Sequence, residues 1–104
     1  MKSGMARPYS LSKRAVQDLQ EIFDRTVGSF GFDQAVSYLQ KLEGVMIDLA
    51  KEPGMGRDRS ELGREVKSFP LKGHIVIYTK SVAGIRGLRV LHGHQDVGDL
   101  RIEG

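Results

Sequence analysis

The chain has 104 residues and a net charge of +3, which is the size of one domain with a modest hydrophobic core. Hydrophobic residues make up 39% and charged residues 28%, which excludes a disordered polar chain, and no apolar run approaches the roughly 20 residues of a membrane helix. The absence of cysteine excludes disulfides and thiolate metal sites and fits a reducing cytoplasm, where we expect the protein to act.

The first residues lead into a helix. Residues 1–7 lack the apolar core of a signal peptide, and we expect them to be a flexible leader to a single domain spanning residues 1–104. Residues 8–11 have the composition of a short edge strand, where a leading proline is tolerated. Ser12 stands where a helix N-cap is expected, because its hydroxyl can accept a backbone N–H of the first turn.

An amphipathic helix is predicted after Ser12. Its apolar face is formed by residues at three- and four-residue steps: Ala15, Val16, Leu19, Ile22, Phe23, Thr26 and Val27. Polar residues, Asp18 among them, are expected on the opposite face. Gly28 and Gly31 are expected to end the helix, as glycine commonly does.

A second amphipathic helix is predicted with Asp33 as its N-cap and Phe32 packing onto its first turn. Pro53 should end this helix near Glu52, because a residue before proline is driven out of the helical conformation. The two helices would form an αα-hairpin whose apolar stripes need a common cover. The second stripe consists of Ala35, Leu39, Leu42, Met46 and Leu49.

The C-terminal half supplies that cover as a small sheet. Residues 66–69, 74–80 and 85–92 are expected to form strands, and the middle run is rich in β-branched and aromatic residues and alternates with a period of two. A break at Lys72 and Gly73 and a short loop at 81–84 favour antiparallel neighbours, whereas 54–63 is expected to be a polar loop. The predicted fold class is α+β, an αα-hairpin packed on a small, mostly antiparallel sheet.

Charge divides the chain into two halves. Residues 57–94 carry eight Lys or Arg against three acids, whereas residues 13–52 carry five against seven. The sheet half is therefore basic and the helical half slightly acidic. A basic face can bind an acidic protein or a nucleic acid, or it can be a solvated surface with no partner, and charge alone does not choose among these.

Arg89, His92 and His94 are the densest cluster of residues that can carry chemistry. Two histidines two residues apart on a strand share a face, and near neutral pH imidazole both donates and accepts protons, which would suit RNA cleavage beside a phosphate-binding arginine. The competing interpretation is structural, with His92 bonded to a backbone carbonyl and His94 in a turn. A metal site would need Asp96 or His74 at a spacing unlike recurrent zinc sites, so we expect no metal and no cofactor.

Several short motifs occur in a characteristic order. They are Leu11-Ser12, Leu49-Ala50 with Pro53 and Gly56-Arg57, Arg59-x-Glu61-Leu62, Ser68-Phe69-Pro70, His74-Ile75-Val76-Ile77-Tyr78, and Arg89-Val90-Leu91-His92-Gly93 with Asp96 three residues on. Over roughly residues 9–100, their order and spacing resemble the ParE toxins of bacterial type II toxin–antitoxin systems, within the RelE/ParE superfamily.

The resemblance implies a β-α-α-β-β-β fold, in agreement with the periodicity. It further implies a protein that is not an enzyme, that inhibits DNA gyrase and so blocks replication, as in plasmid stabilisation, and that is neutralised by a ParD-type antitoxin. The antitoxin would lay a helical C-terminal segment along a groove of the toxin. Neither a membrane partner nor direct sequence-specific nucleic-acid binding is expected.

RelE-type relatives provide the alternative, a ribosome-dependent mRNA endoribonuclease. They use basic residues of the sheet and a late His or Tyr as acid or base. This chain keeps Arg89, with His92 or His94, but it has no tyrosine after Tyr78 and lacks the RelE lysine cluster. A third possibility is an inactive copy that only binds the antitoxin.

Two sets of contact residues are predicted. For gyrase, we expect the basic residues of the sheet half together with the tail after Asp96: Arg57, Arg59, Arg64, Lys67 and Arg86. For the antitoxin, we expect apolar residues that helix packing leaves over, because buried apolar anchors with a charged rim dominate such interfaces. These are Phe23, Val27, Phe30, Tyr38 and Val45.

Overall fold

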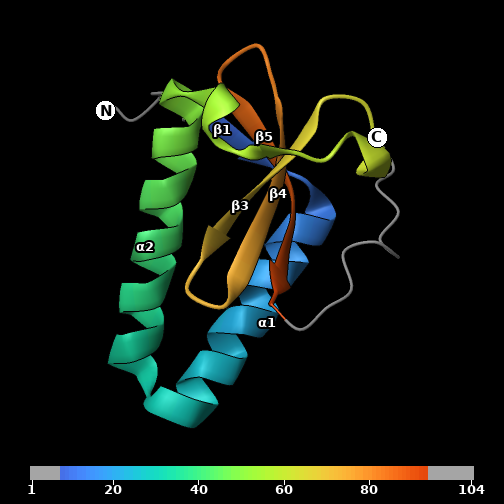
Figure 1. The fold of residues 1–104 in the computed structure, drawn as a ribbon. Coiled ribbons are helices and arrows are strands. Elements are labelled where there is room, and N and C mark those ends of the chain that lie inside the picture. Colours follow the sequence, from blue (N-terminus) through green and yellow to red (C-terminus); the bar gives the residue numbers. More distant parts are fainter. Residues whose placement is uncertain (1–7, 94–104) are drawn as a thin grey trace.

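Two helices pack on a five-stranded, mostly antiparallel sheet in the computed structural model, which describes residues 8–93 (Figure 1). The predicted α+β fold is confirmed, with one additional short strand, β2. The elements in chain order are β1 (Tyr9–Leu11), α1 (Lys13–Phe30), α2 (Phe32–Lys51), β2 (Arg57–Asp58), β3 (Val66–Leu71), β4 (His74–Lys80) and β5 (Ile85–His92), with 3-10 turns at Pro53–Met55 and Ser60–Leu62.

The sheet has the strand order β1-β5-β4-β3-β2. Strand β1 pairs in parallel with β5, and the remaining pairs are antiparallel; the αα-hairpin carries the chain from β1 at one edge of the sheet to β2 at the other. Lys72 and Gly73 join β3 to β4 with φ angles of 42° and 85°, the left-handed backbone of a tight two-residue hairpin turn. The register places His74 of β4 opposite His92 of β5.

The two helices meet at a single residue, Gly31. Helix α1 passes through Gly28 and ends at Phe30, and Gly31 has a φ of 92°. Of the two glycines predicted to end α1, Gly31 is confirmed as its C-cap, whereas Gly28 lies inside the helix. The predicted N-cap at Asp33 is wrong, because Gly31 is itself the N-cap of α2. The predicted ends at Ser12 and Pro53 are confirmed: the Ser12 hydroxyl accepts the Ala15 N–H at 2.9 Å, and α2 ends at Lys51.

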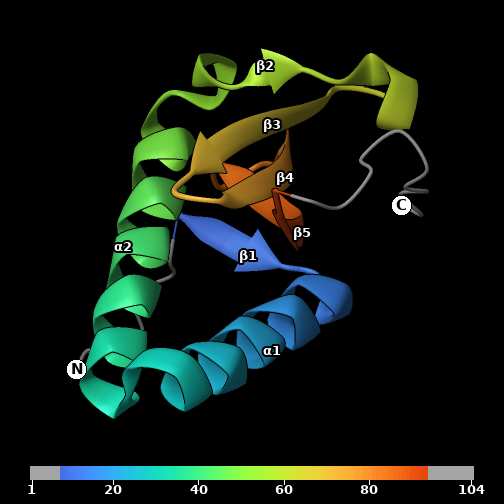
Figure 2. The ribbon, with the colours of Figure 1, turned by 60° about the horizontal axis from the view of Figure 1, so that its bottom comes forward.

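The main core lies between the helices and one face of the sheet, where the helices diverge from Gly31 with β1 in the opening between them (Figure 2). A second cluster on the opposite face is covered by Leu62, so the stretch predicted to be a polar loop contributes to the core. Val16, predicted for the apolar face of α1, is 50% exposed. The main cluster comprises Ile22, Leu42, Met46, Leu49, Val76, Tyr78, Ile85 and Val90.

Tyr78 ties the connection after α2 to the centre of the sheet. Its side chain is fully buried, and its hydroxyl donates to the Pro53 carbonyl at 2.8 Å and accepts the Gly56 N–H at 2.9 Å. A Cβ at Gly56 would collide with this hydroxyl, so glycine is required there for steric reasons. Of the helices described, none is both long and apolar enough to span a membrane.

Candidate functional site

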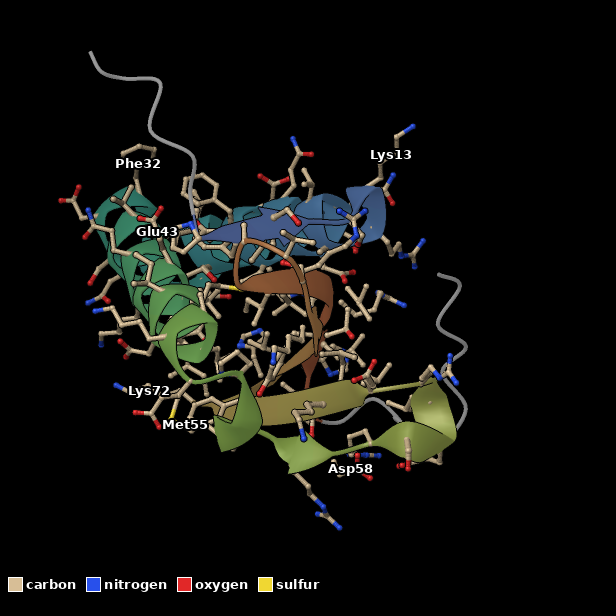
Figure 3. The ribbon with its side chains drawn as sticks, turned by 90° about the horizontal axis from the view of Figure 1, so that it is seen from above. Lys13, Phe32, Glu43, Met55, Asp58 and Lys72 are labelled. Carbon is tan, nitrogen blue, oxygen red and sulfur yellow. The ribbon has the colours of Figure 1, made fainter. Side chains whose placement is uncertain are left out.

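An apolar groove of about 340 Å³ lies where β1 meets both helices. Tyr9 on β1 and Glu43 on α2 form its polar rim, since the tyrosine hydroxyl donates to Glu43 Oε2 at 3.1 Å (Figure 3). The groove is lined by Tyr9, Leu11, Leu19, Val36, Leu39, Gln40, Leu42, Glu43 and Met46. An apolar floor with a polar rim suits one face of an amphipathic segment.

Strand β1 also presents a sheet edge beside this groove. The Ile85 N–H donates to the Pro8 carbonyl at 3.3 Å, and the Ser12 N–H donates to the Gly87 carbonyl at 2.9 Å. Because bonding direction alternates along a strand, the backbone groups of Tyr9 and Leu11 point away from β5. Within residues 8–93 no strand pairs with that far edge.

None of the residues predicted to bind the antitoxin lines the groove. Phe30 is 73% exposed at the end of the αα-hairpin, next to Phe32, whose ring packs edge-to-face on Phe23 with centroids 5.8 Å apart (Figure 3). The others are partly buried: Phe23, Val27, Tyr38 and Val45. Their role stays a prediction. The groove residues of β1 and α2 went unrecognised because their exposure depends on how the helices diverge.

The residues predicted to bind gyrase are not gathered in one patch. Arg57 and Lys67 lie at the β2 edge of the sheet, whereas Arg86 lies beside Ser10 near the opposite edge. Arg64 is exposed, but the Arg59 side chain is only 19% exposed and pairs with Glu61 at 2.7 Å. Their role also stays a prediction.

Arg89 is held by Asp18 on α1, in an ion pair that the sequence pattern did not predict. Its Nε and Nη2 donate to the two carboxylate oxygens at 2.8 and 3.1 Å, and the Val90 N–H donates to the same carboxylate at 2.9 Å. The polar-face prediction for Asp18 is wrong, because this residue is 7% exposed. A signal was present, since Asp18 follows Ala15 by three residues and precedes Ile22 by four, the spacing of the buried face.

This ion pair exists because β1 is short. Past Leu11 the chain turns into α1, which then runs along the edge of β5 that β1 no longer covers. The Ser12 hydroxyl donates to the Leu88 carbonyl at 2.8 Å, and Asp18 accepts the Val90 N–H. Polar side chains of α1 therefore continue the bonding of the sheet edge after the strand ends.

A polar cavity of about 250 Å³ lies beyond the ion pair, between α1 and the end of the β4–β5 pair. It is lined by Arg14, Asp18, Glu21, Ile22, Arg25, His74, Arg89, Val90 and His92. The hydroxyl of Tyr38 lies 2.6 Å from Nδ1 of His74. Burial, with smaller contributions from His92 and Arg25, lowers the pKa of His74, and burial raises the pKa of Tyr38.

The structure describes two of the three residues predicted for RNA cleavage, Arg89 and His92. Arg89 is engaged by Asp18, His92 faces His74 across the strand pair, and His94 and Asp96 lie outside the described residues. In the part of the chain that the structure describes, no three His, Asp or Glu side chains are grouped so as to hold a metal ion.

Comparison with known proteins gives consistent matches. The family model described as ParE toxin of type II toxin-antitoxin system, parDE, matches residues 9–97. Toxin ParE1 of Caulobacter vibrioides is 33% identical over 86 residues, covering 83% of this chain and 88% of the relative. Toxin ParE1 of Mycobacterium tuberculosis is 34% identical over 94 residues, covering 89% and 96%. The solved structure titled "Chromosomal ParDE TA system from P. aeruginosa" shares the fold, with a TM-score of 0.68 at 20% identity, covering 81% of this chain and 92% of that one.

Proposed function

Because the chain belongs to the ParE toxin family of type II toxin–antitoxin systems, we propose that it binds DNA gyrase and blocks replication, and that a ParD-type antitoxin neutralises it. The observation that supports a function in binding rather than catalysis is the ion pair of Arg89 with Asp18. Nε and Nη2 of Arg89 donate to the carboxylate of Asp18, which already neutralises the charge that a scissile phosphate would need.

The apolar groove is the proposed binding site of the antitoxin. Its floor is apolar, its rim carries Tyr9 and Glu43, and the edge of β1 adjoins it. An amphipathic helix would place its apolar residues on this floor. The antitoxin contacts predicted on the αα-hairpin, such as exposed Phe30, lie outside the groove and would add to the surface that the antitoxin covers.

Gyrase is the proposed target, with Arg57, Arg59, Arg64, Lys67 and Arg86 as the proposed contacts. Arg57 and Lys67 lie at one edge of the sheet and Arg86 lies near the other, so the two positions can be changed one at a time. We therefore expect charge reversal at the β2 edge and at Arg86 to affect inhibition separately.

The test is a gyrase supercoiling assay run beside a translation assay on one preparation of the protein. We expect inhibition of supercoiling, intact mRNA on ribosomes, and recovery of supercoiling when the antitoxin is added. Val36→Glu places a charge in the groove without touching the main core cluster, and it should retain inhibition but resist the antitoxin. Ser37→Glu adds the same charge at an exposed site outside the groove and should be neutralised normally.

One observation favours the alternative, ribosome-dependent RNA cleavage. His74 and His92 flank a cavity that Arg25 also lines. The two imidazoles are a possible general acid and general base, and the guanidinium is a possible phosphate ligand. Cleaved mRNA on ribosomes, lost in a folded His74→Gln/His92→Gln double variant, would establish this function. Supercoiling inhibited with the mRNA intact would reject it.

A further inference from the structure

The proposed gyrase inhibition assigns no role to the polar cavity beside α1, although charged side chains line this cavity. It lies on the flank of α1 that carries Arg14, Glu21 and Arg25, whereas Leu19, the groove residue of the same helix, is on the other flank. Its remaining titratable groups come from the two paired strand ends, His74 of β4 and His92 of β5. The cavity is therefore a site separate from the groove.

The charges of the wall leave a positive excess. Arg89 and Asp18 neutralise each other through two hydrogen bonds, and the remaining ions are Arg14 and Arg25 against Glu21. A single anionic group entering the cavity would thus meet two guanidinium groups and two imidazoles. Guanidinium and protonated imidazole are strong hydrogen-bond donors to carboxylate oxygens.

Tyr38 of α2 orients one of these imidazoles. Its hydroxyl lies 3.2 Å from the Leu71 carbonyl and 2.6 Å from Nδ1 of His74, and the direction of the second bond depends on the tautomer of the ring. With Nδ1 held by this hydroxyl, Nε2 is the nitrogen with which His74 can meet a ligand. In the protonated ring Nε2 is a donor and the imidazole is positively charged, and both properties favour an anion.

We propose that this cavity is a receptor for one carboxylate side chain of the antitoxin, held by Arg25 and His74, and that the complex tightens as the pH falls. The proposal rests on the proposed antitoxin partner. The groups facing His74 from every packed element are Tyr38 on α2, His92 on β5, and Arg25 and Glu21 on α1. Arg25 and His92 oppose its protonation, whereas the carboxylate of Glu21 and a bound carboxylate favour it.

A single carboxylate fits the charges around this cavity better than a nucleic-acid backbone does. The helical half, residues 13–52, carries seven acids against five Lys or Arg, and Asp24 and Glu21 are exposed on α1 next to the cavity. A chain of phosphates passing along α1 would be repelled by these carboxylates, because nucleic-acid affinity depends on an array of cations. One carboxylate that enters alone meets Glu21 but also both Arg14 and Arg25, which line the same cavity.

The test measures the dissociation constant of the toxin–antitoxin complex at pH 6.0 and pH 8.0. We expect the wild-type complex to be about tenfold tighter at the lower pH, the effect of one charge-assisted hydrogen bond. Arg25→Gln should weaken binding about tenfold at both pH values, and His74→Gln should abolish the difference between them. Lys13→Gln removes an exposed charge from α1 outside the cavity and should change neither result.

A second experiment uses the toxin without the antitoxin, so that it reports on anion binding in the cavity independently of the partner. The ring protons of His74 are followed by NMR while sodium acetate replaces sodium chloride at constant ionic strength. Acetate should raise the pH at which His74 titrates in the wild type and less so in Arg25→Gln. Inorganic phosphate and a short RNA serve as the competing probes, and an RNA that binds here more tightly than acetate would overturn the carboxylate assignment.

The failures of the two proposals differ. A complex that forms with the same affinity in Arg25→Gln as in Lys13→Gln, and with no dependence on pH, would overturn the carboxylate receptor while leaving the toxin–antitoxin pair intact. If the wild-type chain forms no complex with the antitoxin, the proposed function is refuted. The carboxylate receptor is then refuted as well, because it depends on that complex.

Discussion

Replacing Asp18 by asparagine removes the charge but not the volume of the one charged residue that is buried in the described part of the chain. The carboxylate accepts two hydrogen bonds from Arg89 and one from the Val90 N–H. The amide keeps an acceptor for Val90 but turns an NH₂ group toward the guanidinium. Arg89, whose side chain is 13% exposed, then stays largely buried without a counter-charge.

We expect Asp18→Asn to lower the free energy of unfolding by about 2–3 kcal/mol, below the roughly 3–5 kcal/mol of a fully buried pair because Arg89 retains some contact with water. For a domain of this size the loss corresponds to a decrease in Tm of about 10–20 °C. Urea denaturation followed by circular dichroism measures it. Asp24→Asn, an exposed acid on the same helix, should stay within about 0.5 kcal/mol of wild type.

A double-mutant cycle isolates the pair itself. Arg89→Met removes the partner charge, and in that background Asp18→Asn should cost much less than it does alone, because no unpaired guanidinium remains. Equal urea midpoints for Asp18→Asn and Asp24→Asn would refute the reasoning. They would mean that the contact between α1 and β5 is solvated in solution.

Further predictions concern the buried tyrosine, the helix reversal and the buried histidine. Tyr78→Phe leaves the Pro53 carbonyl and the Gly56 N–H without their partner, and should reduce the free energy of unfolding by about 1–3 kcal/mol in urea denaturation; an unchanged midpoint would mean that water replaces the hydroxyl. Gly31→Ala places a Cβ at a φ of 92° and should cost about 1–2 kcal/mol by the same measurement, whereas Gly28→Ala, inside α1, should be neutral or stabilising. Burial lowers the pKa of His74 below its usual 6.5, so the unfolded chain binds more protons there and stability should fall as the pH drops through about 6.5. Thermal unfolding between pH 5 and 8 measures this, and His74→Gln should show a weaker dependence; a steeper one would reverse the assigned direction.

Local patterns were sufficient for most of the fold. The period-two run from His74 to Lys80 and the run from Ile85 to His92 are both strands with the predicted limits, because each carries β-branched residues and is bounded by a short turn. Ser12 and Pro53 likewise mark helix ends through chemistry confined to a few neighbouring residues.

The errors occur where one residue's conformation depends on distant parts of the chain. Asp33 satisfies the composition of an N-cap, but Gly31 can adopt a positive φ and start α2 two residues earlier. Asp18 is a polar residue whose burial is favourable only because Arg89 and the Val90 N–H lie 71 and 72 residues away in the sequence. No local pattern contains that pairing, although the helical spacing of Asp18 indicated the buried side.

Helix α1 is the element that creates both candidate binding sites. Since β1 stops at Leu11, α1 must complete the bonding of the β5 edge, and Asp18 does this from the middle of its buried face. A helix anchored along its centre line leaves two flanks. One flank turns Leu19 toward the groove with β1 and α2, and the other turns Arg25 toward the histidines at the strand ends. The short first strand is thus the feature from which the apolar groove and the charged cavity both follow.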